Sequence, residues 1–215
     1  MNEVPTNSAL RNKLLRGVEA MELTLTATAI DQLLQYLALL VKWNAAYNLT
    51  AVRDAEQMVS RHLLDSLSVL PFLQGQQFAD VGTGAGLPGL VLAMVEPQKK
   101  FCLIDSNGKK IRFVTQAISE LKLANASALQ TRVEQWQPPS PCDAVLSRAF
   151  ASLAEMASMC EHLLAPAGRL LAMKGNYPAD EIAALPSHWQ VETSQILKVP
   201  DETGQRHLII LSRTH

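Results

Sequence analysis

The stretch that decides the fold is Asp80-Val81-Gly82-Thr83-Gly84-Ala85-Gly86-Leu87-Pro88-Gly89, which holds four glycines in eight residues. A short apolar run that includes Phe78 precedes it, and a second apolar run, Leu90 to Val95, follows it. A strand, a glycine turn and a helix in this order place a bound cofactor at a helix N-terminus, where glycine lets the ligand approach the backbone closely. The stretch therefore predicts an enzyme that binds a nucleotide-type cofactor.

The glycines alone leave the identity of that cofactor open. Their spacing is that of the dinucleotide fingerprint, and Asp105 follows about 20 residues further on, where an acidic side chain binds ribose hydroxyls. This pattern suits NAD and S-adenosylmethionine equally, because both carry an adenosine ribose. Asp80 favours S-adenosylmethionine, since a carboxylate beside the turn attracts a sulfonium and an ammonium group and repels a pyrophosphate. The alternative roles are helix capping for Asp105 and support of the turn's backbone N–H groups for Asp80.

The composition fits one α/β domain with an appendage. The chain has 215 residues, of which 48% are hydrophobic and 18% are charged, and its net charge is −1. Nucleic-acid binding would therefore need a local basic patch. The three cysteines are widely spaced and form no CxxC pair, so neither a disulfide framework nor a metal site is expected. The polar N-terminus and the short apolar runs predict a cytoplasmic enzyme without a membrane partner, which we expect to be a monomer.

The order of elements predicts a helical extension over residues 1–72 and a methyltransferase domain over residues 73–215. Apolar positions at helical spacing predict helices around 10–18, from Thr26 or Thr28 to Ala46, and from Asp54, which opens a capping box, to Pro71. Strands are expected near 77–81, 100–105, 126–131, 142–147 and 168–173, with helices near 88–95, 108–123, 152–165 and 178–184. Two last strands, 190–199 and 207–212, flank a turn at 201–204.

This alternation predicts an α/β, Rossmann-like, mostly parallel seven-stranded sheet that ends in an antiparallel hairpin. Such a hairpin is a feature of class I S-adenosylmethionine-dependent methyltransferases. The chain is also too short for the separate substrate domain of the usual dehydrogenase.

Eight motifs in order along the chain carry a closer resemblance. They are Asn48–Arg53, Arg61–Ser66, Asp80–Gly89, Ile104–Ser106 with Lys109–Phe113, Val133–Glu134, Ser147–Phe150, Lys174–Gly175 and Arg206–Leu208. Together they resemble the ribosomal RNA small subunit methyltransferase G family from about residue 33 to residue 212. Two positions depart from the family pattern: Ala85 stands where relatives carry proline, and Gln205 stands where they usually carry glutamate.

The resemblance implies a specific reaction. It implies methyl transfer from S-adenosylmethionine to N7 of the guanine at nucleotide 527 of 16S rRNA, in the small ribosomal subunit or an assembly intermediate, with an effect on streptomycin sensitivity. The implied cofactor contacts, together with Asp105, are Gly82, Leu87, Val133, Glu134 and Arg148.

Guanine N7 carries an in-plane lone pair and no proton at neutral pH, so its methylation needs no general base. The expected mechanism is therefore positioning of N7 in line with the methyl–sulfur bond. Arg148, just past the fourth strand, is the active-site candidate, and a structural pair with a carboxylate is its alternative role. Cys142 follows a proline, as the nucleophile of cytosine-5 methyltransferases does, but it begins its strand, whereas ligands bind beyond the carboxyl ends of strands. We interpret it as a packed thiol.

Basic and polar residues near the expected site are candidates for RNA contact. They are Asn48, Arg53, His62, Lys109, Lys110, Arg112, Lys174, Arg206 and His207. The alternative role is a solvated face for the lysines and a hydrogen-bonded core residue for His62. Arg61 and Asp65, which lie one helical turn apart near His62, are expected to form an ion pair with each other.

Two other function classes compete with the methyltransferase. An NAD-dependent oxidoreductase would use the same glycine turn, and stabilisation by NADH instead of S-adenosylhomocysteine would identify it. A non-catalytic RNA-binding or ribosome-binding module would keep the fold without the reaction. The intact glycine turn and Asp105 argue against the non-catalytic module.

Overall fold

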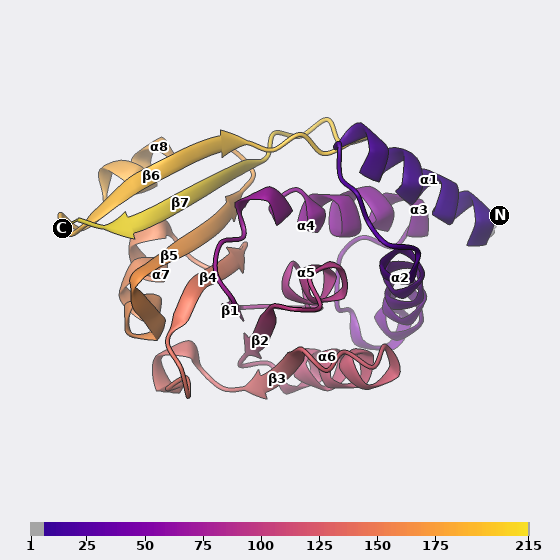
Figure 1. The fold of residues 1–215 in the computed structure, drawn as a ribbon, viewed down its shortest axis with the longest axis horizontal. Helices are drawn as coiled ribbons and strands as arrows, with labels where there is room; N and C mark the ends of the chain where they lie inside the picture. Colours follow the sequence, from indigo (N-terminus) through magenta and orange to yellow (C-terminus); the bar gives the residue numbers. More distant parts are fainter. Residues whose placement is uncertain (1–6, 215) are drawn as a thin grey trace.

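The computed structural model describes residues 7–214, and Figure 1 shows them as one seven-stranded sheet with helices on both faces. The strands are β1 (Gln77–Val81), β2 (Lys100–Asp105), β3 (Ala126–Gln130), β4 (Cys142–Arg148), β5 (Leu164–Lys174), β6 (Trp189–Ile196) and β7 (His207–Arg213). Their order in the sheet is β3-β2-β1-β4-β5-β7-β6. The first five run parallel, and β7 runs antiparallel to both β5 and β6. The predicted fold class, including the C-terminal hairpin, is confirmed.

Two apolar cores lie on opposite faces of this sheet because side chains alternate along each strand. Phe78 of β1 belongs to the core that includes residues of the extension, α5 (Gly89–Val95) and α6 (Gly108–Glu120). Ala79 and Val81, which point to the opposite side of the same strand, belong to the other core, which α7 (Leu153–Cys160) covers, with α8 (Ala179–Ala183) packed at its margin. The carboxyl ends of the parallel strands are therefore held from both sides.

The N-terminal extension comprises α1 (Asn7–Ala20), α2 (Ala27–Tyr47), α3 (Ala55–Met58) and α4 (Asp65–Leu67). Thr26, one of the two caps considered, accepts a hydrogen bond from the Ala29 N–H and begins α2. The inner face of α2 buries Leu33, Tyr36, Leu37 and Leu40 in the core that α5 and α6 share. Because this face has no separate core of its own, the extension depends on the sheet domain for its burial.

The third expected helix, 54–71, is not one regular helix. Asp54 caps α3 as predicted, but a π-helical segment, Val59–Leu64, replaces the α-helix before α4, and Leu70–Phe72 form a 3₁₀ turn. A π turn contains one residue more than an α turn, so it shifts which side chains face inward. Ser60, His62 and Ser66 are consequently buried beside the apolar residues. The apolar periodicity predicted the inward face but not this shift.

The expected helix 152–165 is also shorter in the structure. Helix α7 ends at Cys160, residues Glu161–Leu163 form a 3₁₀ turn, and β5 begins at Leu164, before the predicted position 168. The pairing of β4 with β5 changes register between Cys142 and Ala144. Pro166 and Gly168 lie in this irregular start of β5, and both residue types are typical of irregular positions in strands. At the other end of the sheet, β6 stops at Ile196, three residues earlier than expected.

Candidate functional site

The glycine turn begins where β1 ends, and its conformation requires glycine. Gly82, Gly84 and Gly86 have φ values of 63°, 61° and 87°, in the left-handed region. A Cβ at Gly82 would lie 2.4 Å from the Phe150 ring, and one at Gly86 would lie 2.4 Å from the Leu90 side chain. Gly82 and Gly86 therefore need glycine for both backbone geometry and space, and Gly84 needs it for backbone geometry.

Asp80 supports this turn from inside the sheet. Its side chain is fully buried, and Oδ2 accepts hydrogen bonds from the Thr83 hydroxyl and, at 2.8 Å, from the Gly89 N–H. This is the alternative role considered for it. Its Oδ1 is buried without a hydrogen-bond partner among the described residues. Burial raises the pKa of Asp80 to about 6, although the bonds from Thr83 and Gly89 and the nearby Arg148 oppose the shift.

Asp105 joins the end of β2 to the same turn. Its Oδ2 accepts a hydrogen bond from the Gly84 N–H at 3.0 Å, and its Oδ1 accepts one from the Asn107 N–H at 2.9 Å. The Lys110 ammonium lies 3.6 Å from Oδ2. Asn107, not Asp105, caps α6, so the capping role considered for Asp105 is wrong. Each carboxylate oxygen keeps a further lone pair, so Asp105 can still accept from a ribose hydroxyl.

A cleft of about 470 Å³ opens at these strand ends. It is lined by Gly82, Ile104, Asp105, Ser106, Lys110, Thr131, Arg132, Val133, Glu134, Ala149, Phe150, Ala151, Glu155 and Met159. The structure thus brings four of the expected cofactor residues together: Gly82, Asp105, Val133 and Glu134. The Leu87 side chain is packed in the core instead, so a cofactor contact from Leu87 would come from its backbone.

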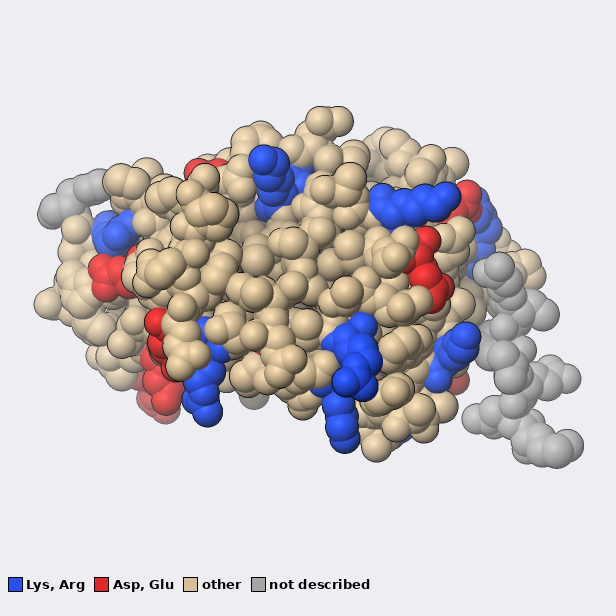
Figure 2. All heavy atoms as spheres, turned by 90° about the horizontal axis from the view of Figure 1, so that it is seen from below, with Lys and Arg blue, Asp and Glu red and all other residues tan. Residues whose placement is uncertain are grey.

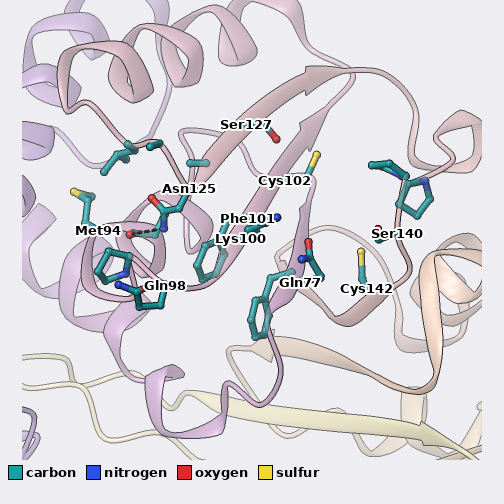
Figure 3. Close-up of a pocket in the computed structure, with 18 of the residues that line it drawn as sticks. Gln77, Met94, Gln98, Lys100, Phe101, Cys102, Asn125, Ser127, Ser140 and Cys142 are labelled. Carbon is teal, nitrogen blue, oxygen red and sulfur yellow. Dashed lines mark hydrogen bonds between the residues drawn. The ribbon is translucent and has the colours of Figure 1, made fainter.

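A larger hollow, about 690 Å³, lies at the opposite edge of the sheet (Figure 3). It is lined by residues that begin strands, including Gln77, Lys100 and Cys142, with Asn125 from the turn before β3. Ligands of parallel α/β sheets bind beyond the carboxyl ends of the strands, so this hollow is not the expected cofactor site despite its size. Burial raises the pKa of Cys142 to about 12, which keeps it a packed thiol.

Arg148 connects the sheet to the extension instead of lining the cleft. Its Nη1 donates to Asp65 Oδ2 at 2.9 Å and to the Arg61 carbonyl at 3.0 Å. Asp65 is almost completely buried, and its Oδ1 accepts from Arg206 Nε at 3.1 Å. The alternative role of Arg148, a pair with a carboxylate, is therefore present. The pair considered between Arg61 and Asp65 is wrong, because Arg61 pairs with Glu202.

The polar residues after α2 form a cluster near Arg148. His62 Nε2 lies 2.9 Å from the Thr50 hydroxyl, and burial together with Arg148 lowers the pKa of His62 to about 4, so its ring is neutral at pH 7. Asn48 ends α2 in the left-handed conformation, and its Oδ1 accepts from the Arg53 guanidinium. The structure therefore brings Asn48 and Arg53 together, with their side chains at the surface, and keeps His62 inside.

The remaining RNA candidates have different environments. Lys109 and Arg112 are exposed on the first turns of α6, whereas Lys174 donates to the Ala151 carbonyl and pairs with Glu181 at 2.7 Å. His207 is buried, with Nδ1 3.2 Å from the Gly175 carbonyl. On the face in Figure 2, Lys and Arg stand at separate places with uncharged surface between them. No broad basic surface covers that face.

The sequence of the chain is similar to that of a family of known methyltransferases. A family model described as rRNA small subunit methyltransferase G matches residues 29–209. The chain belongs to this family. It is 53% identical over 204 residues to ribosomal RNA small subunit methyltransferase G of Pseudomonas aeruginosa strain LESB58, covering 94% of this chain and 95% of that protein. It is 54% identical over 197 residues to the Marinobacter nauticus protein of the same name, covering 92% of each.

Solved structures at low identity show the same fold. N-methyltransferase NodS from Bradyrhizobium japonicum, solved with S-adenosylhomocysteine, superposes with a TM-score of 0.56 at 12% identity, covering 81% of this chain and 100% of that one. A ribosomal protein L11 methylase from Lactobacillus delbrueckii superposes with a TM-score of 0.55 at 15% identity, covering 71% of this chain and 77% of that one. Family and fold are those of S-adenosylmethionine-dependent methyltransferases, so S-adenosylmethionine, and not NAD, is the cofactor.

Sequence reasoning missed several residues that shape this site. Tyr36 reaches the glycine turn from α2, Thr83 bonds to Asp80, and Asp65 binds two arginines. The motif Arg61–Ser66 was a signal for Asp65, but nothing in the spacing indicated which arginine it meets. Within residues 7–214, no group of His, Cys, Asp or Glu is arranged to hold a metal ion, and no helix is long and apolar enough to cross a membrane.

Proposed function

We propose that the chain transfers the methyl group of S-adenosylmethionine to N7 of the guanine at nucleotide 527 of 16S rRNA. The observation that carries the proposal is the cleft between Gly82 and Asp105, at the carboxyl edge of a sheet in this family. The substrate in the proposal comes from the family resemblance and from the name of relatives about half identical in sequence. The reaction would take place in the bacterial cytoplasm, where ribosomal subunits are assembled.

The residues at the cleft fit the cofactor. Gly82 gives close access to the backbone, Asp105 offers lone pairs to the ribose, and the Val133–Glu134 turn lines the same cleft, where it would contact the adenine. Asp80 does not line the cleft, but its buried Oδ1 has no hydrogen-bond partner among the described residues, and its carboxylate behind the turn would favour the ammonium end electrostatically. When bound, S-adenosylmethionine supplies an electrophilic methyl group on a sulfonium.

The rest of the chemistry requires orientation and not proton removal. N7 has a free lone pair, so the chain's residues need only hold the base at near-attack distance. His62 is neutral and already bonded to Thr50, which argues against a general-base role. Arg148 lies between Asp65 and the cleft-lining segment 149–151, where it would fix the active-site wall or donate to the guanine O6 edge.

Recognition of RNA is proposed to depend on a folded ribosomal substrate. Among the RNA-contact candidates, the exposed cations are Arg53, Lys109 and Arg112, and the net charge of the chain is −1. Nonspecific affinity for RNA comes from released counterions and rises with the number of cations that contact phosphates. Binding to naked, unstructured RNA at physiological salt should therefore be weak, and nanomolar affinity in filter binding would contradict this part of the proposal.

The proposal is tested by methyl incorporation from labelled S-adenosylmethionine. Small subunits from a strain that lacks this enzyme should accept about one methyl group each, and subunits from the parent strain should accept almost none. No incorporation into unmodified subunits or their assembly intermediates would favour the non-catalytic ribosome-binding module.

A further inference from the structure

A side chain of the helical extension reaches the glycine turn. Tyr36 of α2 is completely buried, and its hydroxyl donates a 2.7 Å hydrogen bond to the backbone carbonyl of Ala85. The two residues are 49 positions apart in the sequence. Ala85 lies between Gly84 and Gly86, both in the left-handed region, so this bond holds the part of the turn that most depends on glycine.

The Tyr36 contact approaches the turn from the side away from the cleft. Ala85 is buried and is not among the cleft-lining residues, whereas Gly82 and Asp105 are. Asp105 and Asp80 hold Gly84 and Gly89 from within the sheet domain. Tyr36 therefore gives the extension a direct hydrogen bond to the turn, in addition to those that the sheet domain supplies.

The surroundings of Tyr36 keep its hydroxyl in place. Its ring packs against Phe113 of α6, with centroids 6.1 Å apart, and α6 begins just after Asp105. Burial raises the pKa of the phenol, so the group remains a hydrogen-bond donor throughout the physiological range. A buried donor without its acceptor, or the reverse, costs free energy, so the pair favours one conformation of the turn.

We propose that Tyr36 is a positioning residue for S-adenosylmethionine, and that the helical extension holds the glycine turn in its binding conformation through this hydroxyl. The inference rests on the cofactor placement proposed above. If the extension favours the bound conformation of the turn, occupancy of the cleft must in turn stabilise α2, because coupling between two sites is reciprocal. The extension is then part of the cofactor site as well as a neighbour of the RNA-binding candidates.

The test uses the full chain, S-adenosylhomocysteine and two matched variants. Tyr36→Phe removes only the hydroxyl that bonds to Ala85. Tyr47→Phe removes a hydroxyl from the same helix, where the ring is partly exposed and stacks on Trp43. We expect Tyr36→Phe to weaken S-adenosylhomocysteine binding, measured calorimetrically well below the melting temperature, by about fivefold or more. Tyr47→Phe should leave the affinity unchanged.

Hydrogen exchange gives a second readout. In the wild type, S-adenosylhomocysteine should slow exchange of the α2 amides around Tyr36 more than that of the β6 amides, because a ligand that only stabilises the whole fold would slow both alike. If Tyr36→Phe does not fold, this wild-type measurement decides alone: a larger slowing at α2 supports the inference, and an equal or absent slowing overturns it.

Unchanged affinity in a folded Tyr36→Phe also overturns the inference, whatever the loss of stability. A Gly82→Ala variant separates this result from a failure of the cofactor placement. If that variant binds normally, the placement is wrong. If it loses binding while Tyr36→Phe binds normally, only the role of Tyr36 is wrong.

Discussion

At the residue scale, the shape of the cleft depends on the missing side chain of Gly82. Gly82 leaves the space that a Cβ would take from the Phe150 ring, and its φ of 63° is one that other residues rarely adopt. The positions of the glycines, Asp80 and Asp105 beside one another could be predicted from the sequence because β1, α5 and β2 form one local β–α–β unit. Asp65 and Tyr36 could not, since their partners lie 83 and 49 positions away and depend on how the extension packs.

Gly82→Ala should weaken cofactor binding. The added methyl group would displace Phe150 and strain the backbone, so S-adenosylhomocysteine affinity should fall about tenfold or more by titration calorimetry. Gly175→Ala is the control, because a Cβ there meets nothing within 4 Å. Equal affinities for both variants would show that the turn is not the binding element.

Asp65→Asn should destabilise the fold more than a surface pair does. The change removes one buried charge that Arg148 and Arg206 share, and urea unfolding should show a loss of about 2–3 kcal/mol. Asp31→Asn, which breaks an exposed pair with Arg11, should cost less than about 1 kcal/mol. Similar losses would mean that the Asp65 pairs are no stronger than surface pairs.

His62 should make stability depend on pH below neutrality. Its folded pKa of about 4 lies below the ordinary 6.5, so the unfolded chain binds a proton that the folded chain excludes between these values. Stability present above pH 6.5 is lost as the pH falls towards 4, by about 2 kcal/mol between pH 7 and pH 5. His62→Gln should lose this part of the dependence in urea titrations, and His188→Gln, at an exposed site, should keep it. If the unfolding free energy of His62→Gln depends on pH as steeply as that of the wild type, His62 is not the source of the dependence.

At the element scale, apolar runs predicted the strands and most helices because burial sets their period. The π-helical segment Val59–Leu64 escaped prediction, since one extra residue in a turn leaves no local signature in composition. The early start of β5 was also not predicted, because its register shift is set by its pairing with β4. Irregular elements thus depend on tertiary contacts that the sequence pattern does not specify.

Loss of the N-terminal cap of α7 should affect ligand binding in the cleft. Ser152 and Glu155 form a capping box directly after the cleft-lining segment 149–151. Ser152→Ala should cost about 1 kcal/mol in urea unfolding and should also weaken S-adenosylhomocysteine binding. Ser158→Ala, at an exposed position of the same helix, should change neither. An unaltered affinity in Ser152→Ala would separate the cap from the cleft.

At the scale of the whole molecule, the proposed cofactor cleft opens at the carboxyl edge of the one sheet, and the extension shares a core with α5 and α6. Figure 1 shows α2 beside these two helices. The sequence distinguishes the helical segment from the α/β alternation because the two differ in hydrophobic period. It could not show that Asp65, Arg148 and Arg206 join the extension, β4 and the segment before β7 at one place. The substrate side of the proposed reaction would be formed at this junction.

The central claim is most directly tested by locating the methyl group. Unmodified small subunits are incubated with the enzyme and S-adenosylmethionine, and the 16S rRNA is then treated with borohydride and aniline, which cleave RNA at N7-methylguanine. We predict one new enzyme-dependent cleavage, at nucleotide 527, that is absent with Gly82→Ala. Methylation without such cleavage, or cleavage at another guanine, would contradict the proposed reaction.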